Sequence, residues 1–460
     1  MVRILKWLAG AALAFVLFST AVYLVSRAMG PTRAEREALA RVDAPVAYGR
    51  HDGFSALWSL GYDVPPGEQA AVLAEDVRRA TALPPAGMPG SGTFAPWRSA
   101  REDWPRLGGS GAGDPGWCRA REAGCLDRVG AGPGKVAALP EPNAPALERV
   151  EALTSFDHFR SPFPPREEIP FPEYQQLVRP ATHAAWRFSQ GDVDAGLSGA
   201  CSGISRGRTL VAAGDSLIGS MMGAALIQGN TTLLAEMLAE LPRDRALPAP
   251  CAEAFAAVVP LQEGVCRTML SEGRFMAATF RSQLTGTMAS EAAKRKFPGW
   301  TLRLLFDPER AAARTAPTFA WYCGDEAGGL LAQDRPLHDP TPPPSRWSLA
   351  CASNYIGCIL SDIARPAYGD YGRRLQDADA RLRTMAALLW LRTQEGPIDA
   401  VALERLPATM RSPARPLQLD ATTGTLATAV YGKPTVDDSG AGAWSVPLPA
   451  SRLQSAGASP

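Results

Sequence analysis

The sequence predicts a mainly α-helical protein with an N-terminal transmembrane helix, a TPR-like body of helical hairpins and a small C-terminal β-hairpin. The chain opens with a continuous apolar segment, apolar residues recur at helical spacing through its middle, and an alternating pattern appears only after residue 411. These patterns divide the 460 residues into an anchor (1–29), juxtamembrane helices with a Gly/Pro-rich loop (30–150), an α-helical domain (151–410) and a β-hairpin with a disordered tail (411–460).

Residues 4–25 are predominantly apolar, and Lys6 is their only charged residue. As a helix they span about 33 Å, enough to cross a hydrocarbon core of about 30 Å. A cleaved signal peptide is the alternative, because Ser26, Arg27 and Ala28 fit a small-x-small cleavage site. The apolar run is longer than an ordinary signal-peptide core of about 7–15 residues. We therefore expect a retained, single-pass anchor in the inner membrane.

Basic residues lie on both sides of this segment, so the positive-inside rule leaves its orientation open. The cysteines are the deciding signal, and they are Cys118, Cys125, Cys201, Cys251, Cys266, Cys323, Cys351 and Cys358. An even number of cysteines behind a membrane anchor is typical of disulfides in an oxidising compartment, which predicts a body in the periplasm. Free thiols in the cytoplasm are the alternative. Zinc ligation is disfavoured, because the chain has no Cys-x-x-Cys and no histidine at ligand spacing to a cysteine.

Eight cysteines allow about 105 pairings. Cys118 and Cys125 are the expected local pair, because Gly124 and its neighbours make a turn-rich segment that can close. Cys351 and Cys358 have the same separation but fall in a predicted helix, where two turns place them about 10 Å apart. We expect each of these two to bond to another helix. The remaining candidates as their partners are Cys201, Cys251, Cys266 and Cys323.

The middle of the chain predicts helices at 183–192, 193–207, 210–229 and 231–241, with Gly-Asp or Gly-Asn at breaks and Asn230 capping the last. This pattern is typical of antiparallel hairpins in TPR-like arrays, although no fixed period repeats. An extended segment is predicted at 156–172. Further helices are predicted at 31–45, 53–61, 67–82, 139–153, 250–258, 261–272, 274–296, 346–364 and 372–394. Strands are predicted at 416–420, 425–431 and 444–448.

Residues 214–217, Gly-Asp-Ser-Leu, are the literal signature of GDSL-type esterases, in which Ser216 would be the nucleophile. That family places a strand before the motif and has later Gly-x-Asn-Asp and Asp-x-x-His blocks for the oxyanion donor and the base. Here the preceding segment is a poor strand, the first block is absent, and His338 lies one residue too far from Asp334. Ser216 is therefore a weak catalytic candidate, and a position near a helix N-terminus is the alternative.

Other chemistry has little support in the sequence. The net charge is +1, with 47 basic and 46 acidic residues evenly spread, which disfavours a nucleic-acid-binding surface. Glycine-rich stretches lack the strand-before and helix-after context of a phosphate loop, so no cofactor is expected. The paired carboxylates at 167–168 and 437–438 are interpreted as solvated charges. The four histidines are scattered: His51, His158, His183 and His338.

Residues 56–65 (ALWSLGYDVP), 117–126 (WCRAREAGCL) and 213–219 (AGDSLIG) follow the apolar anchor. Together they resemble uncharacterised membrane-anchored proteins of Gram-negative bacteria. Residues 381–424 are similar to a C-terminal module of uncharacterised envelope proteins, with Leu-x-x-Leu-Pro followed by Pro-Leu-x-x-Asp and Thr-Gly. The resemblance implies an envelope location and a helix followed by a β-hairpin, and it brings no activity with it.

We therefore expect a binding or scaffold protein without its own catalysis, tethered to the inner membrane through residues 4–25. Its partner would be another envelope protein or a peptide, because helical hairpins offer concave binding surfaces. The alternative is an envelope hydrolase, either an esterase at Ser216 or a cell-wall enzyme that uses carboxylates.

Overall fold

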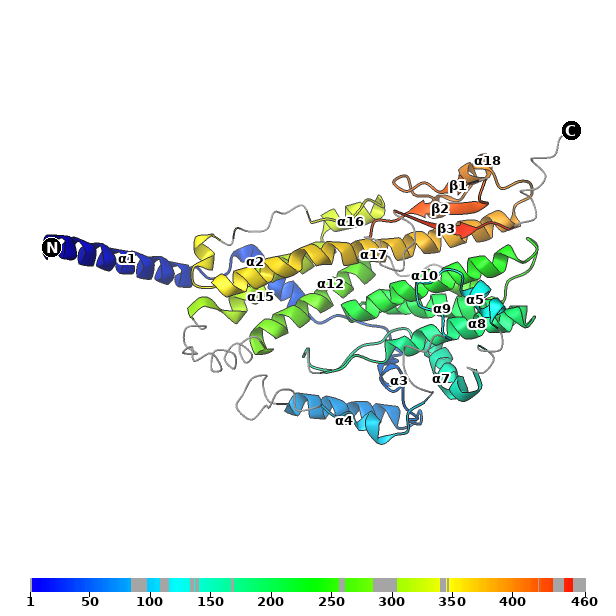
Figure 1. Cartoon of the computed structure of the whole chain (residues 1–460), viewed down its shortest axis with the longest axis horizontal. Helices are drawn as coiled ribbons and strands as arrows, with labels where there is room; N and C mark the ends of the chain where they lie inside the picture. The colour runs from blue at the N-terminus through cyan, green and yellow to red at the C-terminus, as the bar shows by residue number, and fades with distance from the viewer. Residues whose placement is uncertain are drawn as a thin grey trace.

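The computed structural model describes residues 2–83, 97–107, 116–132, 136, 140–166, 169–255, 261–283, 304–339, 345, 347–420, 422–432 and 442–449. The fold is mainly helical, with a small antiparallel sheet near the C-terminal end (Figure 1). Most of the predicted Gly/Pro-rich loop, the end of the helix predicted at 274–296 and the predicted disordered tail lie outside the described residues.

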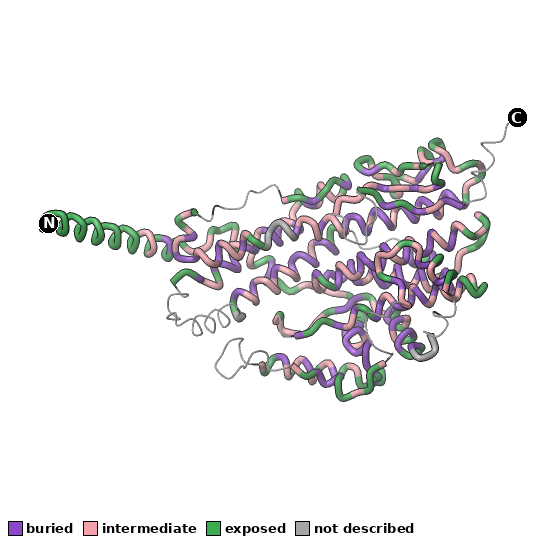
Figure 2. The backbone as a smooth tube through the Cα atoms, viewed as in Figure 1, coloured by how far each residue is buried: buried purple, intermediate pink, exposed green. Residues whose placement is uncertain are grey.

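Helix α1 (Val2–Ala28) extends from one end of an elongated body, whose longer helices run along the same direction (Figure 1). It is long and apolar enough to span a membrane, and its apolar window is not buried by the rest of the protein (Figure 2). Helix α2 (Arg33–Asp43) follows after a short turn. Its start is a capping box, in which the Thr32 hydroxyl accepts from the Glu35 N–H and the Glu35 carboxylate accepts from the Thr32 N–H.

A layer of short elements lies along one side of the body (Figure 1). These are α3 (Phe54–Trp58), α4 (Gln69–Ala82) and the 3₁₀ turn η1 (Ala100–Asp103). They meet at the buried carboxylate of Asp76, which accepts from the Trp58 indole at 2.7 Å, the Ser99 hydroxyl at 2.5 Å and the Ala100 N–H at 2.6 Å. Because Asp76 lies on α4, Trp58 on α3, and Ser99 and Ala100 at the start of η1, this one satisfied carboxylate holds the three elements together.

Three consecutive helices form the centre of the body: α8 (Arg179–Ser189), α9 (Val193–Ala213) and α10 (Leu217–Ala239). Gly214 ends α9 in the left-handed region, with φ of 59°, as glycine does at helix ends. Helices α9 and α10 approach closely at Gly207 and Gly223, since a Cβ on Gly207 would lie 2.7 Å from the Gly223 carbonyl oxygen. The hairpin therefore depends on glycine inside its helices as well as at its turn.

The predicted boundaries inside this hairpin are wrong. Asn230 does not cap a fourth helix, because α10 runs through it to Ala239. The Asn230 side chain is buried, and its amide donates to the Leu226 carbonyl at 2.9 Å. It packs against Gly203, where any Cβ would come within 2.3 Å of it. Because the Asn230 side chain is hydrogen-bonded within its own helix, the residue is accommodated in the helix interior and the helix does not end there.

The other helices pack around this centre. They are α5 (Cys125–Ala131), α7 (Pro140–Ala152), α11 (Ala249–Ala254), α12 (Leu261–Ala278), which continues into a π-helical turn (Thr279–Gln283), α15 (Pro308–Ala320), α16 (Asp325–Ala332), α17 (Tyr355–Thr393) and α18 (Ala400–Glu404). Short 3₁₀ turns lie at Leu153–Ser155 (η2), Tyr174–Val178 (η3), Trp321–Cys323 (η5), Leu349–Cys351 (η6) and Ala408–Met410 (η7). Helices α15 and α16 are not among the predicted ones.

Helix α17 has 39 residues and is about 58 Å long at 1.5 Å per residue. It corrects the prediction of two helices at 346–364 and 372–394. Gly372 does not begin a helix but lies inside α17, where a Cβ would come 3.0 Å from the Tyr322 ring. The glycine therefore allows close packing. Before α17, residues 349–351 form the 3₁₀ turn η6 in place of the predicted helix.

The C-terminal sheet has the order β1-β2-β3 and is antiparallel throughout: β1 (Gln418–Asp420), β2 (Thr425–Ala429) and β3 (Ala443–Pro447). This confirms the predicted strands. Leu426 pairs with Val446, and both are fully buried in a core shared with α10 and α17. The Trp444 indole donates to the Thr232 hydroxyl of α10 at 3.2 Å. The sheet is thus packed onto the helical body, as Figure 1 shows for its position over α17.

Candidate functional site

The eight cysteines form four disulfides: Cys118–Cys125, Cys201–Cys251, Cys266–Cys323 and Cys351–Cys358. The first is the predicted local pair. The prediction that Cys351 and Cys358 bond to other helices is wrong, because their Cα atoms lie 6.0 Å apart. Cys351 belongs to the 3₁₀ turn η6 and not to a regular helix, so the two turns of helix assumed between the cysteines do not exist.

The Gly-Asp-Ser-Leu motif forms the turn between α9 and α10. Ser216 is the N-cap of α10, and its hydroxyl accepts a hydrogen bond from the Gly219 N–H at 3.0 Å. It also hydrogen-bonds to the hydroxyl of the buried Tyr174. Leu217, the next residue, is buried in the core. Every residue of the motif thus has a structural role in this turn, which fits the position near a helix N-terminus named as the alternative to catalysis.

A serine nucleophile needs a base within hydrogen-bond reach. Within the described residues, no histidine side chain is hydrogen-bonded to Ser216. The four histidines lie elsewhere: His158 contacts Asp157 and stacks on Tyr48, His183 stacks on Trp186, His338 contacts the Pro336 carbonyl, and His51 donates its backbone N–H to Asp157. The described geometry therefore brings no histidine base to this hydroxyl.

Replacing Ser216 with Ala is expected to lower the free energy of unfolding by about 1 kcal/mol, the ordinary effect of losing an N-cap. Ser216→Asp keeps a capping oxygen and should be close to wild type. Urea unfolding of the three proteins checks this order. A fluorophosphonate probe should label wild type and Ser216→Ala equally. Labelling that disappears only in Ser216→Ala would instead support the esterase alternative.

The neighbouring Asp215 has its carboxylate in a partly buried position, where it accepts from the Ser161 N–H at 2.9 Å. This bond holds Ser161, which belongs to the segment predicted to be extended (156–172), against the α9–α10 turn. Burial raises the pKa of Asp215 to about 6, although the Ser161 hydrogen bond and the charge of Arg274 oppose the shift. Burial therefore moves the ionisation of Asp215 from its ordinary range near pH 4 to about pH 6 in the folded protein.

This shift predicts a pH-dependent effect of Asp215→Asn. A raised folded-state pKa gives stability that is present below the ordinary value, near pH 4, and is lost as the pH rises through about 6. Asparagine accepts from Ser161 but never ionises, so relative to wild type the variant should gain about 1–3 kcal/mol between about pH 4 and about pH 7.5. Urea unfolding at both pH values measures the change, and an equal difference at the two would contradict the prediction.

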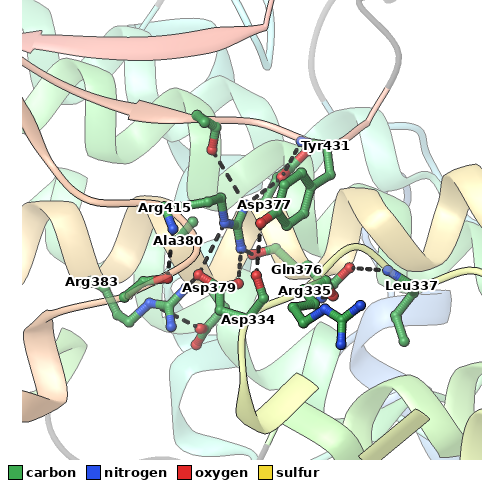
Figure 3. Close-up of polar contacts among 12 residues, drawn as sticks. Asp334, Arg335, Leu337, Gln376, Asp377, Asp379, Ala380, Arg383, Arg415 and Tyr431 are labelled. Atoms are coloured by element: carbon green, nitrogen blue, oxygen red, sulfur yellow. Dashed lines mark hydrogen bonds and ion pairs between the residues drawn. The ribbon is translucent and has the colours of Figure 1, made fainter. Parts of the chain in front are cut away.

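A deeply buried ionic cluster lies between α17 and the sheet (Figure 3). The Arg415 side chain is 1% exposed, and its Nε donates to Asp334 at 3.0 Å while its Nη1 donates to Asp377 at 2.7 Å. Its Nη2 also bonds to Asp334 and to the Gln376 carbonyl. The guanidinium lies 4.1 Å from the centre of the Tyr431 ring. All three guanidinium nitrogens of Arg415 have acceptors within the protein, so the cluster holds the segments that contribute to it together.

Each member of this cluster comes from a different segment. Asp334 follows α16, Asp377 lies on α17, and Tyr431 follows β2 and donates its hydroxyl to the Asp334 carbonyl at 2.7 Å. Burial opposes ionisation of Asp334, but the hydrogen bond from Arg415 and the charge of Arg383 hold its pKa below the ordinary value. Sequence reasoning missed this cluster, because no local pattern joins residues about 40 to 80 positions apart.

An apolar groove of about 540 Å³ lies beside the sheet. Its lining includes Leu403, Leu406, Pro413, Pro416 and Leu417. Leu403, Leu406, Pro416 and Leu417 belong to the two short motifs that carry the resemblance of the C-terminal module. The motifs therefore meet at one surface of the folded protein.

The junction between α1 and the body is a second buried polar cluster. Ser26 is fully buried, and its hydroxyl accepts from the Ser353 N–H at 3.0 Å and shares a hydrogen bond with the Ser353 hydroxyl at 2.9 Å. Arg310 donates to the Ser353 hydroxyl and to the Ala350 carbonyl, both at 2.6 Å. In the sequence, Ser26 is notable only as part of a possible cleavage site. In the structure, it joins α1 to the body through its hydrogen bonds to Ser353.

Among the described residues, no group of three or more His, Cys, Asp or Glu side chains is arranged to hold a metal ion. No protein-family model matches the chain, and no curated protein or solved structure matches it.

Proposed function

We propose that the protein is a membrane-anchored scaffold of the bacterial envelope, related to the membrane-anchored envelope proteins that it resembles. Helix α1 would span the inner membrane and hold a rigid helical body at its periplasmic face. One observation carries this proposal: an exposed apolar helix, long enough to cross a bilayer, carries near its C-terminal end a residue, Ser26, that is fully buried in the body. An anchor built into the core in this way fixes the position of the body.

The junction supports a retained anchor over a cleaved signal peptide. Cleavage after Ala28 would remove Ser26 and leave the buried backbone N–H of Ser353 without the hydroxyl that accepts from it. An unsatisfied buried polar group destabilises a protein by about 1–3 kcal/mol. A signal peptide that is cleaved off does not contribute buried hydrogen bonds to the mature protein, whereas Ser26 does so here. The mature chain is therefore expected to have the mass of the uncleaved sequence.

The disulfides support a body outside the cytoplasm. All eight cysteines are paired, and disulfides persist in the periplasm but are rare in the cytosol. Because basic residues lie on both sides of α1, the disulfides are what favours the orientation with the N-terminus inside. The eight thiols should react with a maleimide only after reduction.

The partner we propose is another envelope protein or a peptide. Short three-residue turns join α8 to α9 and α9 to α10, which supports the TPR-like hairpin arrangement, and such hairpins bind partners on their faces. The use of the Ser216 hydroxyl as a helix cap favours binding over catalysis. Crosslinking in cells from photoreactive residues on the body should give discrete adducts, and a body that yields none would contradict the scaffold.

Topology is tested with two cysteine variants of the full chain. Val401→Cys places a thiol on an exposed position of α18, and Arg3→Cys places one at the exposed start of α1. In cells with a permeabilised outer membrane, an impermeant maleimide should label Val401→Cys at once and Arg3→Cys only after lysis. The reverse pattern, or labelling of wild type without reduction, would overturn the proposal.

A further inference from the structure

Exposed apolar side chains gather at the end of the body from which α1 emerges. Met29, Trp347 and Leu349 are 52%, 80% and 42% exposed, and we call them the junction patch. Leu349 belongs to η6, which packs against α1, and Trp347 lies two residues earlier in the same loop. A large aromatic side chain that is mostly exposed is unusual unless one side of it meets an apolar medium.

The junction places this patch beside the membrane that α1 would span. The apolar run of α1 ends at Val25, and the next residue, Ser26, is hydrogen-bonded to Ser353 and to the Ala350 carbonyl. Trp347 is three positions before Ala350, so their Cα atoms lie at most about 11 Å apart. The headgroup layer on each side of the hydrocarbon core is about 5–8 Å thick. Trp347 is therefore within reach of that layer.

The loop that carries Trp347 and Leu349 is held in place. The Cys351–Cys358 disulfide ties η6 to α17, and Arg310 bonds to both Ala350 and Ser353 from α15. The Trp347 ring also lies 6.0 Å from the Tyr355 ring at the start of α17. Because the loop is bonded to both α1 and the body, the exposed Trp347 indole stays at a fixed distance from the membrane boundary.

We propose that Met29, Trp347 and Leu349 insert into the headgroup layer of the bilayer that α1 spans, so that the body is seated on the membrane surface. This inference rests on the proposed membrane anchorage of α1. Trp is enriched at membrane interfaces because its ring is apolar and its N–H is polar. Arg27 is exposed and lies two positions before Met29, and its positive charge complements the negative charge of anionic headgroups.

The test uses full-length protein in vesicles of phosphatidylcholine and phosphatidylglycerol. Spin labels are attached to Trp347→Cys, to Val401→Cys and to Phe15→Cys, and no native thiol competes because all eight are in disulfides. Val401 is the matched control, an exposed apolar residue (60%) on α18, far from α1 in Figure 1. Collision of each label with oxygen and with a water-soluble nickel chelate reports its depth in the bilayer.

The Trp347 label should gain oxygen collisions and lose nickel access relative to Val401, and it should lie shallower than Phe15. A Trp347 label as open to nickel as Val401 would overturn the inference. A label shielded from both reagents would also overturn it and would indicate a protein contact. If the Phe15 label is itself in water, the proposed anchorage fails. If Phe15 is deep and Trp347 is aqueous, only the inference fails.

Discussion

Replacing Arg415 with Met is expected to lower the free energy of unfolding by about 3–5 kcal/mol. The change leaves the carboxylates of Asp334 and Asp377, which are 7% and 3% exposed, buried without the guanidinium that pairs them. The effect should be concentrated in the sheet, because Arg415 ties the segment after β2 to α17. Urea unfolding measures the total loss, and hydrogen exchange of the β2 amides measures the local one.

Arg411→Met is the matched control for this variant. Arg411 lies four residues earlier and is exposed, so its replacement should change stability by less than about 0.5 kcal/mol. Arg415→Lys keeps the charge but loses the planar fork that reaches two carboxylates, and it should fall between wild type and Met. Adding Asp334→Asn and Asp377→Asn to Arg415→Met should recover part of the loss. Equal stability of the Arg411 and Arg415 variants would show that the buried cluster does not stabilise the packing of the sheet on α17.

Removing the Cys201–Cys251 disulfide is expected to have a comparable effect. The two cysteines are separated by 50 positions and are fully buried between α9 and α11. In the chain-entropy model, opening a loop of this length destabilises the folded protein by about 4 kcal/mol. The double variant Cys201→Ala/Cys251→Ala should therefore unfold at a clearly lower urea concentration than wild type.

The Cys351–Cys358 disulfide serves as the comparison, because it closes a loop of only 7 positions. The same model gives about 2.5 kcal/mol for its removal. The long-range pair should thus matter more than the local one, as measured by urea unfolding of both double variants under identical conditions. The opposite order would mean that the disulfides act chiefly through local geometry and not through the unfolded chain.

The Gly-Asp-Ser-Leu motif illustrates which parts of a site a sequence predicts. Its alternative interpretation, a position near a helix N-terminus, follows from the turn chemistry of glycine and serine and agrees with the structure. The partners of Asp215 and Ser216 do not follow from it. Ser161 and Tyr174 lie roughly 40 to 55 positions away, and only the packing of the extended segment onto the turn brings them there.

At Asn230 and Gly372, by contrast, the helix boundaries predicted from single residues are wrong. Both residues are common at helix ends, and both lie inside helices here. Their propensities are weak because they amount to less than about 1 kcal/mol per residue. Close contacts with Gly203 in one case and Tyr322 in the other outweigh them. Boundaries that depend on a single such residue are therefore decided by packing.

By itself the sequence determined the features that depend on neighbours in the chain: the exposed apolar helix, the mainly helical body, the Cys118–Cys125 pair and the C-terminal strands. Only the tertiary structure decided which distant groups meet. Ser26 and Ser353 are 327 positions apart, and Arg415 and Asp334 are 81 apart. The physical reason is that helix periods and turns arise from contacts within a few residues, whereas buried polar pairs depend on how complete segments pack.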